Sequence, residues 1–191
     1  MPKTRLEAFS DAVIAILMTI MVLELTIPHG ADWAALRSLV PVFIAYVLSF
    51  VNLGIYWNNH HHMLFVANRI NGKILWANLF LLFSLSLFPF TTGWMGENEF
   101  AAVPTASYGL VSLMAAISYF ILQSAIKAEH GPDSKLAVAL GRDAKGKVSP
   151  IMYLAAIPLA FVNKWIAFGL YVVVALMWLI PDRRIEATLE R

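Results

Sequence analysis

Long apolar runs separated by short polar stretches dominate this chain. A helix needs about 20 predominantly apolar residues to cross a bilayer, and four runs of about that length come before the last third of the sequence. The first run, Leu6 to Ile27, contains 22 residues and is followed by Pro28, through which a helix seldom continues. The pattern predicts four membrane-spanning helices, over residues 6–27, 38–57, 74–95 and 104–127. Pro89 predicts a kink toward the far end of the third helix.

The last third of the chain has a weaker pattern. Residues 128–147 are polar, with Gly and Pro at both ends, which is typical of a loop. Residues 148–180 are apolar apart from Asn163 and Lys164. This arrangement predicts a hairpin of two short spans, 148–163 and 165–180, near the lower length limit for crossing a bilayer. A single long tilted helix is the alternative. With the hairpin, residues 1–191 form one six-span transmembrane domain.

Composition supports a chain that lies mostly in the bilayer. Hydrophobic residues make up 60% of the sequence, above the roughly 45–50% typical of a soluble protein. The sequence contains no cysteine, which excludes disulfide frameworks, thiolate metal sites and thiol nucleophiles. A signal peptide is the alternative for residues 6–27. That run is too long for the apolar h-region of a signal peptide, contains Asp11 and Glu24, and lacks a small-residue cleavage site.

The basic residues determine the expected orientation. In a six-span topology, only Arg37 and Lys164 of the 14 basic residues fall on one side of the membrane. Cytoplasmic loops of membrane proteins carry the excess of Lys and Arg, so the side with the other twelve is the cytoplasm, and both termini lie there. A five-span topology moves the three C-terminal arginines outside and weakens this bias. We therefore expect an all-α, multi-pass protein of the cell membrane.

The first predicted span carries polar residues near its cytoplasmic end. Thr4 and Glu7 have the spacing of a capping box, which predicts that the helix begins near Arg5. Asp11 then lies roughly 9 Å further along the helix axis. An unpaired carboxylate is costly at that depth and usually faces the bundle interior or water.

Two other spans bring polar groups to the level of Asp11. The second span ends at Trp57 and continues into Asn58 to His62, and Asn78 lies about as deep in the third span. Depth alone therefore predicts a polar cluster that holds the cytoplasmic end of the first helix against its neighbours. The simpler alternative is that Asp11 reaches the interface alone or pairs with Arg5.

Other chemistry is not indicated. Adjacent histidines on a helix point in different directions and no HxxxH pair accompanies them, so we expect no metal site. A histidine cluster that titrates near neutral pH fits the pattern better. The sequence lacks GxSxG, HExxH, Walker and dinucleotide-binding motifs, and it lacks the TVGYG loop of carbonyl-lined potassium filters. We expect no enzymatic activity, no cofactor and no nucleic-acid partner.

A second feature of the first span is an apolar stripe beyond Asp11. Ile16, Ile20 and Leu23 recur at the spacing that places residues on one face of a helix, with Thr19 beside them. Such a stripe packs into a core, contacts lipid or lines a pore. Periodicity alone does not distinguish these three roles.

The segment Arg5 to Asp11 contains the motif RxxxFSD. It resembles the signature of the first helix in the transmembrane-protein-175 family of lysosomal and bacterial potassium channels. Supporting matches are WNNHHH at Trp57 to His62, LWANL around Asn78, and the pair Pro89–Phe90. They follow the family order along the predicted helices and cover roughly half of the chain.

The resemblance implies a potassium-preferring cation channel in which the first helices of four six-span subunits line a central pore. It implies that Ile16 forms a hydrophobic constriction, and that the pore lining comprises Ile16, Thr19, Ile20 and Leu23. It also implies a structural polar network behind the pore, made of Arg5, Phe9, Ser10, Asp11, Trp57, His60 and Asn78. A single six-span unit resembles the bacterial, homotetrameric branch, which implies the bacterial inner membrane, membrane lipid as surroundings, and monovalent cations, K⁺ above all, as the permeant species.

Two other functions fit parts of the sequence. A small proton-coupled secondary transporter could use Asp11 and the histidines, although the sequence lacks an inverted repeat and midplane helix breaks. A membrane-embedded assembly or enzyme subunit is the third hypothesis.

Overall fold

The structure is a computed structural model that describes residues 2–65, 67, 69–130 and 144–179. These residues are almost entirely helical. The helices are α1 (Lys3–Ile20), the 3₁₀ turn η1 (Met21–Glu24), α2 (Trp33–Arg37), α3 (Val40–Phe65), α4 (Gly72–Ser86), α5 (Phe88–Glu97), α6 (Ala102–His130), α8 (Ala144–Val162) and α9 (Lys164–Leu179).

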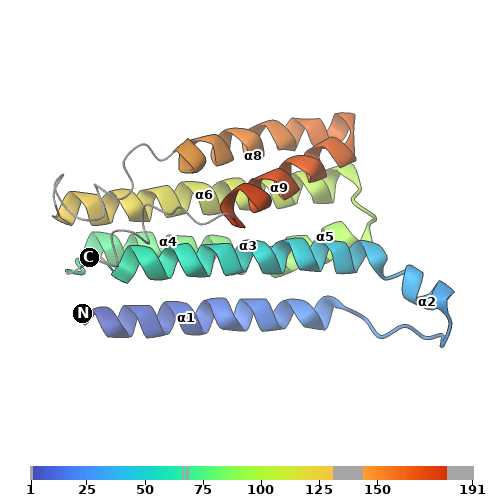
Figure 1. Cartoon of the computed structure of the whole chain (residues 1–191), viewed down its shortest axis with the longest axis horizontal. Helices are drawn as coiled ribbons and strands as arrows, with labels where there is room; N and C mark the ends of the chain where they lie inside the picture. Colours follow the sequence, from blue (N-terminus) through green and yellow to red (C-terminus); the bar gives the residue numbers. More distant parts are fainter. Residues whose placement is uncertain (1, 66, 68, 131–143, 180–191) are drawn as a thin grey trace.

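Successive long segments run back and forth in opposite directions along one axis (Figure 1). Five helical segments of the described chain are long and apolar enough to cross a bilayer: Lys3–Glu24, Val40–Phe65, Gly72–Glu97, Ala102–His130 and Ala144–Val162. The shorter helix α9 is also apolar. The chain is therefore a multi-pass membrane protein, as the apolar runs predicted.

The first helix differs from the prediction at both ends. The α-helix starts at Lys3 with Pro2 as its N-cap and no side-chain cap, so the predicted Thr4–Glu7 capping box is wrong. The Glu7 carboxylate instead lies 3.6 Å from the Lys3 ammonium, because opposite charges four residues apart attract on a helix surface. At the other end the α-helix stops at Ile20 and continues only as the turn η1.

Two other predicted segments are divided by breaks. The segment predicted over residues 74–95 consists of α4 and α5, which meet at Leu87. Pro89 lies in the first turn of α5, where its missing N–H needs no partner. Helices α8 and α9 are separated by Asn163, whose Oδ1 accepts a hydrogen bond from the backbone N–H of Trp165 (2.9 Å). Most of the predicted loop over residues 128–147 lies outside the described residues.

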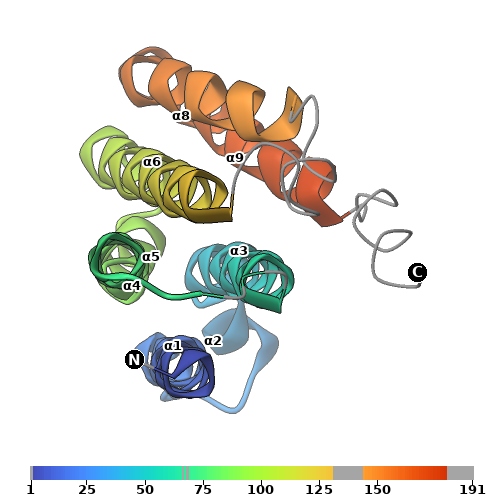
Figure 2. The same cartoon turned by 90° about the vertical axis from the view of Figure 1, so that its left-hand side faces the viewer.

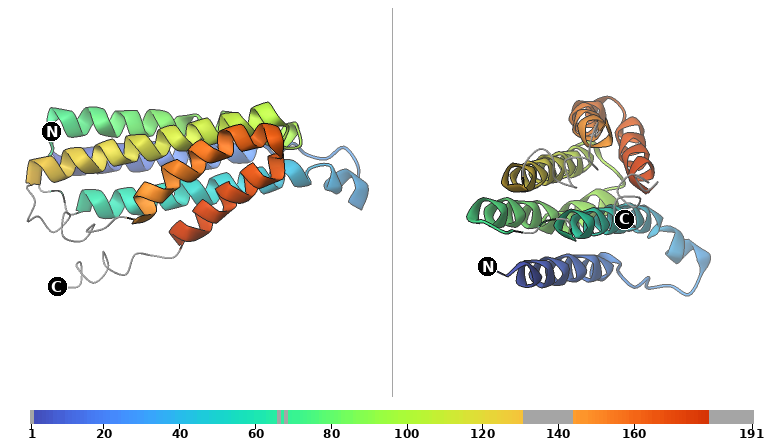
Figure 3. Two further views of the ribbon diagram at one scale, coloured as in Figure 1. Left: turned by 90° about the horizontal axis from the view of Figure 1, so that it is seen from above. Right: turned by 60° about the vertical axis from the view of Figure 1, so that its left-hand side comes forward.

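The helices are stacked in order across the molecule. Seen along the helix axes, α1 lies at one edge, α3 and the α4–α5 pair form the next layer, α6 follows, and α8 and α9 cover the other edge (Figure 2). The two further views show the same order, with the α8–α9 pair crossing the others at an angle (Figure 3). Helix α1 is thus an outer element that packs on one side only.

The buried centre is built around Tyr108 of α6. Its hydroxyl bonds with the side chains of Ser49 (3.2 Å) and Asn52 (2.9 Å) of α3. Its ring lies 5.5 Å from the Phe88 ring and 5.3 Å from the Tyr171 ring, measured between centroids. Satisfied buried polar groups of this kind connect helices without leaving a desolvated donor or acceptor. Residues from α3, α5, α6 and α9 therefore converge on one side chain.

Candidate functional site

Helix α1 has two distinct faces. The face toward α3 and α4 carries Leu6, Ser10, Ile14, Leu17 and Met21, all of which are buried. These residues recur at intervals of three or four, the spacing of one stripe along a helix. The opposite face is exposed in the single chain, consistent with the position of α1 at the edge of the bundle (Figure 2). The helix is therefore held from one side.

A chain of buried hydrogen bonds crosses three helices at the cytoplasmic level predicted for α1. The Nε2 atom of His60 on α3 lies 2.7 Å from Oδ1 of Asn78 on α4. Asn78 Nδ2 donates to the Ser10 hydroxyl on α1 (3.0 Å), and that hydroxyl donates to the Leu6 carbonyl (2.8 Å). Because the Asn78 carbonyl faces His60, the imidazole donates from Nε2. The bonded groups of this Ser10–Asn78–His60 chain are completely shielded from solvent or nearly so.

Two further polar contacts join α1 to α3 nearer the surface. The indole Nε1 of Trp57 donates to Oδ1 of Asp11 (3.1 Å). Lys3 Nζ donates to the backbone carbonyl of Phe65 at the end of α3 (2.8 Å) and lies 5.5 Å from the centre of the Phe65 ring. Unpaired carbonyls and the negative end of the helix dipole make a helix C-terminus a favourable site for a cation. No local sequence signal indicates this contact of Lys3.

The residues expected to line a pore lie on the exposed face of α1 and η1. Ile16 is 54% exposed and Leu23 is 77% exposed in the single chain, and Ile20 and Thr19 are also exposed. The Thr19 hydroxyl donates to the backbone carbonyls of Ala15 and Ile16 (3.1 and 2.9 Å). Its proton is thus directed at the helix, and the oxygen lone pairs remain available on the outer face.

Two residues assigned to the polar network by resemblance are not brought into it within the single chain. Phe9 is 48% exposed. The Arg5 guanidinium is exposed and makes no hydrogen bond or ion pair with the described residues. Both lie on the outward side of α1, whereas Ser10 and Asp11 reach α4 and α3.

The run of three histidines divides between two environments. The His60 side chain is buried against Asn78, while His61 is exposed, its ring stacked 6.4 Å from the Trp57 ring. Within the described part of the chain, no three His, Cys, Asp or Glu side chains gather as metal ligands do.

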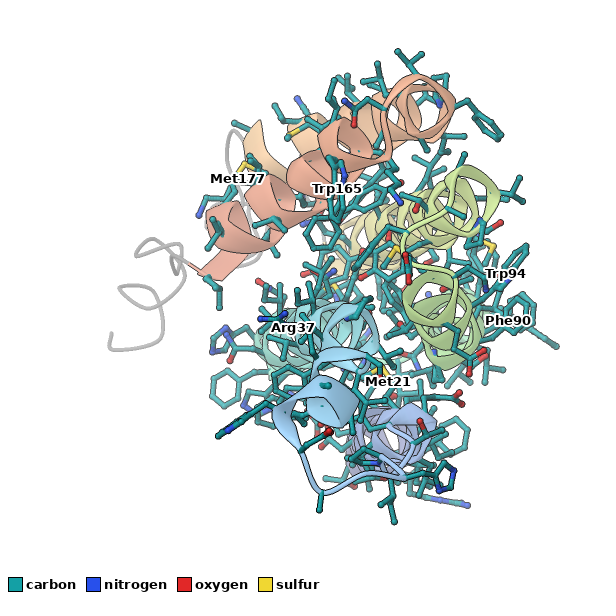
Figure 4. The ribbon with its side chains drawn as sticks, turned by 90° about the vertical axis from the view of Figure 1, so that its right-hand side faces the viewer. Met21, Arg37, Phe90, Trp94, Trp165 and Met177 are labelled. Carbon is teal, nitrogen blue, oxygen red and sulfur yellow. The ribbon has the colours of Figure 1, made fainter. Side chains whose placement is uncertain are left out.

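The C-terminal end of α1, with η1, is held differently. Met21 is completely buried and points inward between η1 and the neighbouring helices, whereas Phe90 and Trp94 project outward from α5 (Figure 4). The Glu24 carboxylate packs over Gly93 of α5, where a Cβ atom would lie 2.8 Å from its Oε2. Among the described residues Glu24 makes no hydrogen bond or ion pair. Apolar contact therefore replaces polar bonding at this end.

A comparison with protein families agrees with this geometry. Residues 5–89 match the sequence model of the family described as "Endosomal/lysosomal potassium channel TMEM175". The matched region begins at Arg5 and ends at Pro89, so it contains α3, α4, all of α1 except its first two residues, and the contacts that Ser10 and Asp11 make with α4 and α3. The family is one of ion channels, not of enzymes.

Individual relatives cover nearly the whole chain. A potassium channel of Chryseobacterium sp. (strain P1-3) is 51% identical over 190 residues, which cover 100% of this chain and 99% of the relative. A potassium channel of Chamaesiphon minutus is 29% identical over 187 residues, which cover 90% of this chain and 91% of the relative.

A solved structure is similar over the same length. The crystal structure of a lysosomal potassium-selective channel TMEM175 homolog from Chamaesiphon minutus matches with a TM-score of 0.83 and 28% identity. The match covers 94% of this chain and 97% of that one. The resemblance found in the RxxxFSD motif is thus confirmed over the full length, and the chain belongs to the TMEM175 family of potassium channels.

Proposed function

We propose that this protein is a potassium-preferring cation channel in which α1 helices from four identical subunits surround a central pore. The observation that carries the proposal is the two-faced α1. Its inner face is bonded to α3 and α4, and its outer face leaves Ile16, Thr19, Ile20 and Leu23 exposed. One helix cannot enclose a pore, so these side chains line one only where copies of α1 meet about a symmetry axis.

The narrowest point of the proposed pore is a ring of Ile16 side chains. A ring of isoleucines has no oxygen atoms to replace the hydration shell of an ion, and a sufficiently narrow apolar ring excludes water and blocks conduction. Thr19 lies one turn outward and directs its oxygen lone pairs away from its own helix. We therefore expect K⁺ to be preferred over Na⁺ by a moderate factor, since K⁺ sheds its hydration shell more readily.

The polar contacts at the cytoplasmic end act as anchors for the pore-lining helix in this proposal. Ser10, Asp11 and Lys3 are bonded to Asn78, Trp57 and the Phe65 carbonyl, respectively. Three attachments along two turns restrict rotation of α1 about its own axis. The rotation in turn determines whether Ile16 or a neighbouring residue faces the axis.

Reconstituted protein provides the test of function. Purified protein in liposomes or planar bilayers with unequal K⁺ and Na⁺ gives a reversal potential, and we expect it to lie toward the K⁺ equilibrium potential. No ionic current from a folded preparation contradicts the channel. Saturable flux that requires a proton gradient indicates the transporter instead.

Assembly and topology need separate measurements. Native mass spectrometry of the purified protein should give a mass of four chains, since each chain contributes one α1. The chain has no cysteine, so single cysteines introduced at Lys3 and at Lys164 report their side of the membrane to an impermeant thiol reagent. We expect labelling from outside at position 164 and from the cytoplasm at position 3, in the inner membrane of a bacterium.

A further inference from the structure

A cavity with several polar side chains in its lining lies between helices of the subunit, remote from α1. Residues of α3, α6, α8 and α9 line it. Helices α6, α8 and α9 lie on the far side of α3 from α1 (Figure 2). Its polar lining includes Asn52, Tyr56, Asn59, Tyr119, Ser149 and Tyr153. Among the described residues that line it, none is an Asp, Glu, Lys or Arg. This lining suits a neutral hydrogen-bonding occupant, because an ion would meet no opposite charge from these side chains.

Three of the lining groups need hydrogen-bond partners that the described residues do not supply. Asn52 uses Nδ2 to donate to the Tyr108 hydroxyl (2.9 Å), and its Oδ1 accepts no hydrogen bond from the described chain. The hydroxyls of Tyr56 and Tyr153 make none either. Asn52 and Tyr153 are each only 4% exposed. A buried polar group without a partner is costly.

These groups face the cavity rather than packed protein. Among the described residues, Thr105 Oγ1 is the one side-chain polar atom that is both fully enclosed and without a partner. The amide oxygen of Asn52 and the two phenols are therefore accessible from the space that they line. An acceptor and two hydroxyls that can each donate or accept converge on one volume.

The volume of the cavity limits the size of the molecule that it can hold. It offers about 40 Å³ to the centres of water-sized molecules, and about 10–15 Å³ of such space is enough for one water. A dry cavity that binds benzene is far larger, about 150 Å³. The space is thus sufficient for more than one water and is well below the volume of that dry cavity.

We propose that this cavity is a built water site, in which bound water bonds to Asn52 Oδ1 and to the hydroxyls of Tyr56 and Tyr153. Asn52 and Tyr56 belong to α3, and Tyr153 belongs to α8. Helix α8 packs chiefly on α6 and α9, so the water adds a hydrogen-bonded connection from α8 to α3. Water with two to four polar partners is retained in protein interiors as part of the structure.

A double-mutant cycle on the full-length purified protein tests this connection. Tyr56→Phe and Tyr153→Phe should each lower Tm, because each removes one partner of the shared water and leaves the other groups less well bonded. The double variant should lose less than the sum of the two single losses, since the second hydroxyl is worth less once the water is weakened. Additive losses would contradict a shared water.

The matched control is Tyr46→Phe on the same helix. The Tyr46 ring packs between Phe43 and Phe50, and Tyr46 is not among the residues that line the cavity. Combined with Tyr153→Phe, it should give additive shifts in Tm. Non-additivity of this pair as well would show that the coupling is general and would overturn the interpretation.

A filling variant separates a wet cavity from a dry one. Ala116 of α6 lines the space, and Ala116→Leu would occupy it. Displacing water that bonds to the buried Asn52 and Tyr153 and the half-buried Tyr56 should lower Tm, whereas filling a dry cavity with methyl groups raises Tm. If Ala116→Leu does not fold, the test is a density map of the unaltered protein at a resolution that shows water. Water bonded to Tyr56 and Tyr153 supports the site, and a dry cavity overturns it.

Discussion

The two ends of α1 are attached to the rest of the subunit by different physics. The N-terminal end is joined by directional hydrogen bonds in which Lys3, Ser10 and Asp11 take part. Beyond Asp11, burial of Ile14, Leu17 and Met21 is what holds the helix. Hydrogen bonds specify a rotation and a depth, while apolar contact tolerates sliding and repacking more readily.

Ile16 lies between the hydrogen-bonded part of α1 and the part held by apolar contacts. It lies five residues beyond Asp11, about 7.5 Å along the axis, and the α-helix itself ends four residues later. A helix fixed at one end and apolar at the other moves most at its apolar end. In the proposed channel, gating therefore consists of movement of the outer half of α1 about the anchored half.

The largest expected effect is on the central residue of the anchors. Asn78→Leu removes both groups that Asn78 supplies, so His60 Nε2 is left buried and unbonded, and the Ser10 hydroxyl keeps only its bond to the Leu6 carbonyl. We expect a loss of about 2 kcal/mol in the free energy of unfolding, seen as a lower temperature of aggregation in detergent. The control is Asn58→Leu, an exposed position on α3, which should be unchanged. Equal stability of the two variants contradicts the anchor.

The second effect concerns conduction. Ile16→Asn places an amide where the proposed ring excludes water, and the hydrated ring should pass more current. A roughly fivefold increase corresponds to a barrier lower by about 1 kcal/mol. The measurement is single-channel or macroscopic current in bilayers. Ile117→Asn, at an exposed position on α6, is the control and should leave the current as it was. An unchanged current in the Ile16 variant places that residue outside the pore.

A smaller effect is expected at the solvent-accessible anchor. Trp57→Phe keeps an aromatic six-membered ring and removes the indole N–H that donates to Asp11. Because Trp57 is 46% exposed and water replaces the lost bond, we expect a loss of about 0.5 kcal/mol. In the Trp57→Phe background, Asp11→Asn should then cause little further loss of unfolding free energy, since the hydrogen bond between the two residues is already absent. Thermal melting of the four combinations measures this, and full additivity shows that the two residues act independently.

The smallest effect is expected at the outer end. Gly93→Ala places a Cβ atom 2.8 Å from the Glu24 carboxylate, which is the far end of a flexible side chain and can move aside. We expect a change below about 0.5 kcal/mol. Gly96 of the same helix is the contrast, because a Cβ there would lie 2.7 Å from the Val42 backbone, which cannot move freely. If melting shows Gly93→Ala to be the more harmful, the outer end is more rigid than its contacts indicate.

The sequence indicated the depth of the anchor residues but not their pairing. Asp11, Trp57 and Asn78 lie at one level because helix rise is constant, and counting residues is sufficient to place them. Which groups bond depends on how each helix is rotated against its neighbours. Asn78 thus meets Ser10 and His60, and Asp11 meets Trp57. Lys3 reaches the Phe65 carbonyl only because α1 and α3 lie side by side with opposite directions.

By itself the sequence determined that this protein is helical, crosses the membrane repeatedly and belongs with potassium channels. Those properties follow from run length, the placement of basic residues and a short motif, all of which are local. Only the tertiary structure decided that α1 is held by hydrogen bonds at one end and by apolar contacts at the other, and that its α-helix stops at Ile20. It also decided that three polar groups line one cavity. These depend on contacts between residues distant in the chain, and such contacts leave no periodic trace in it.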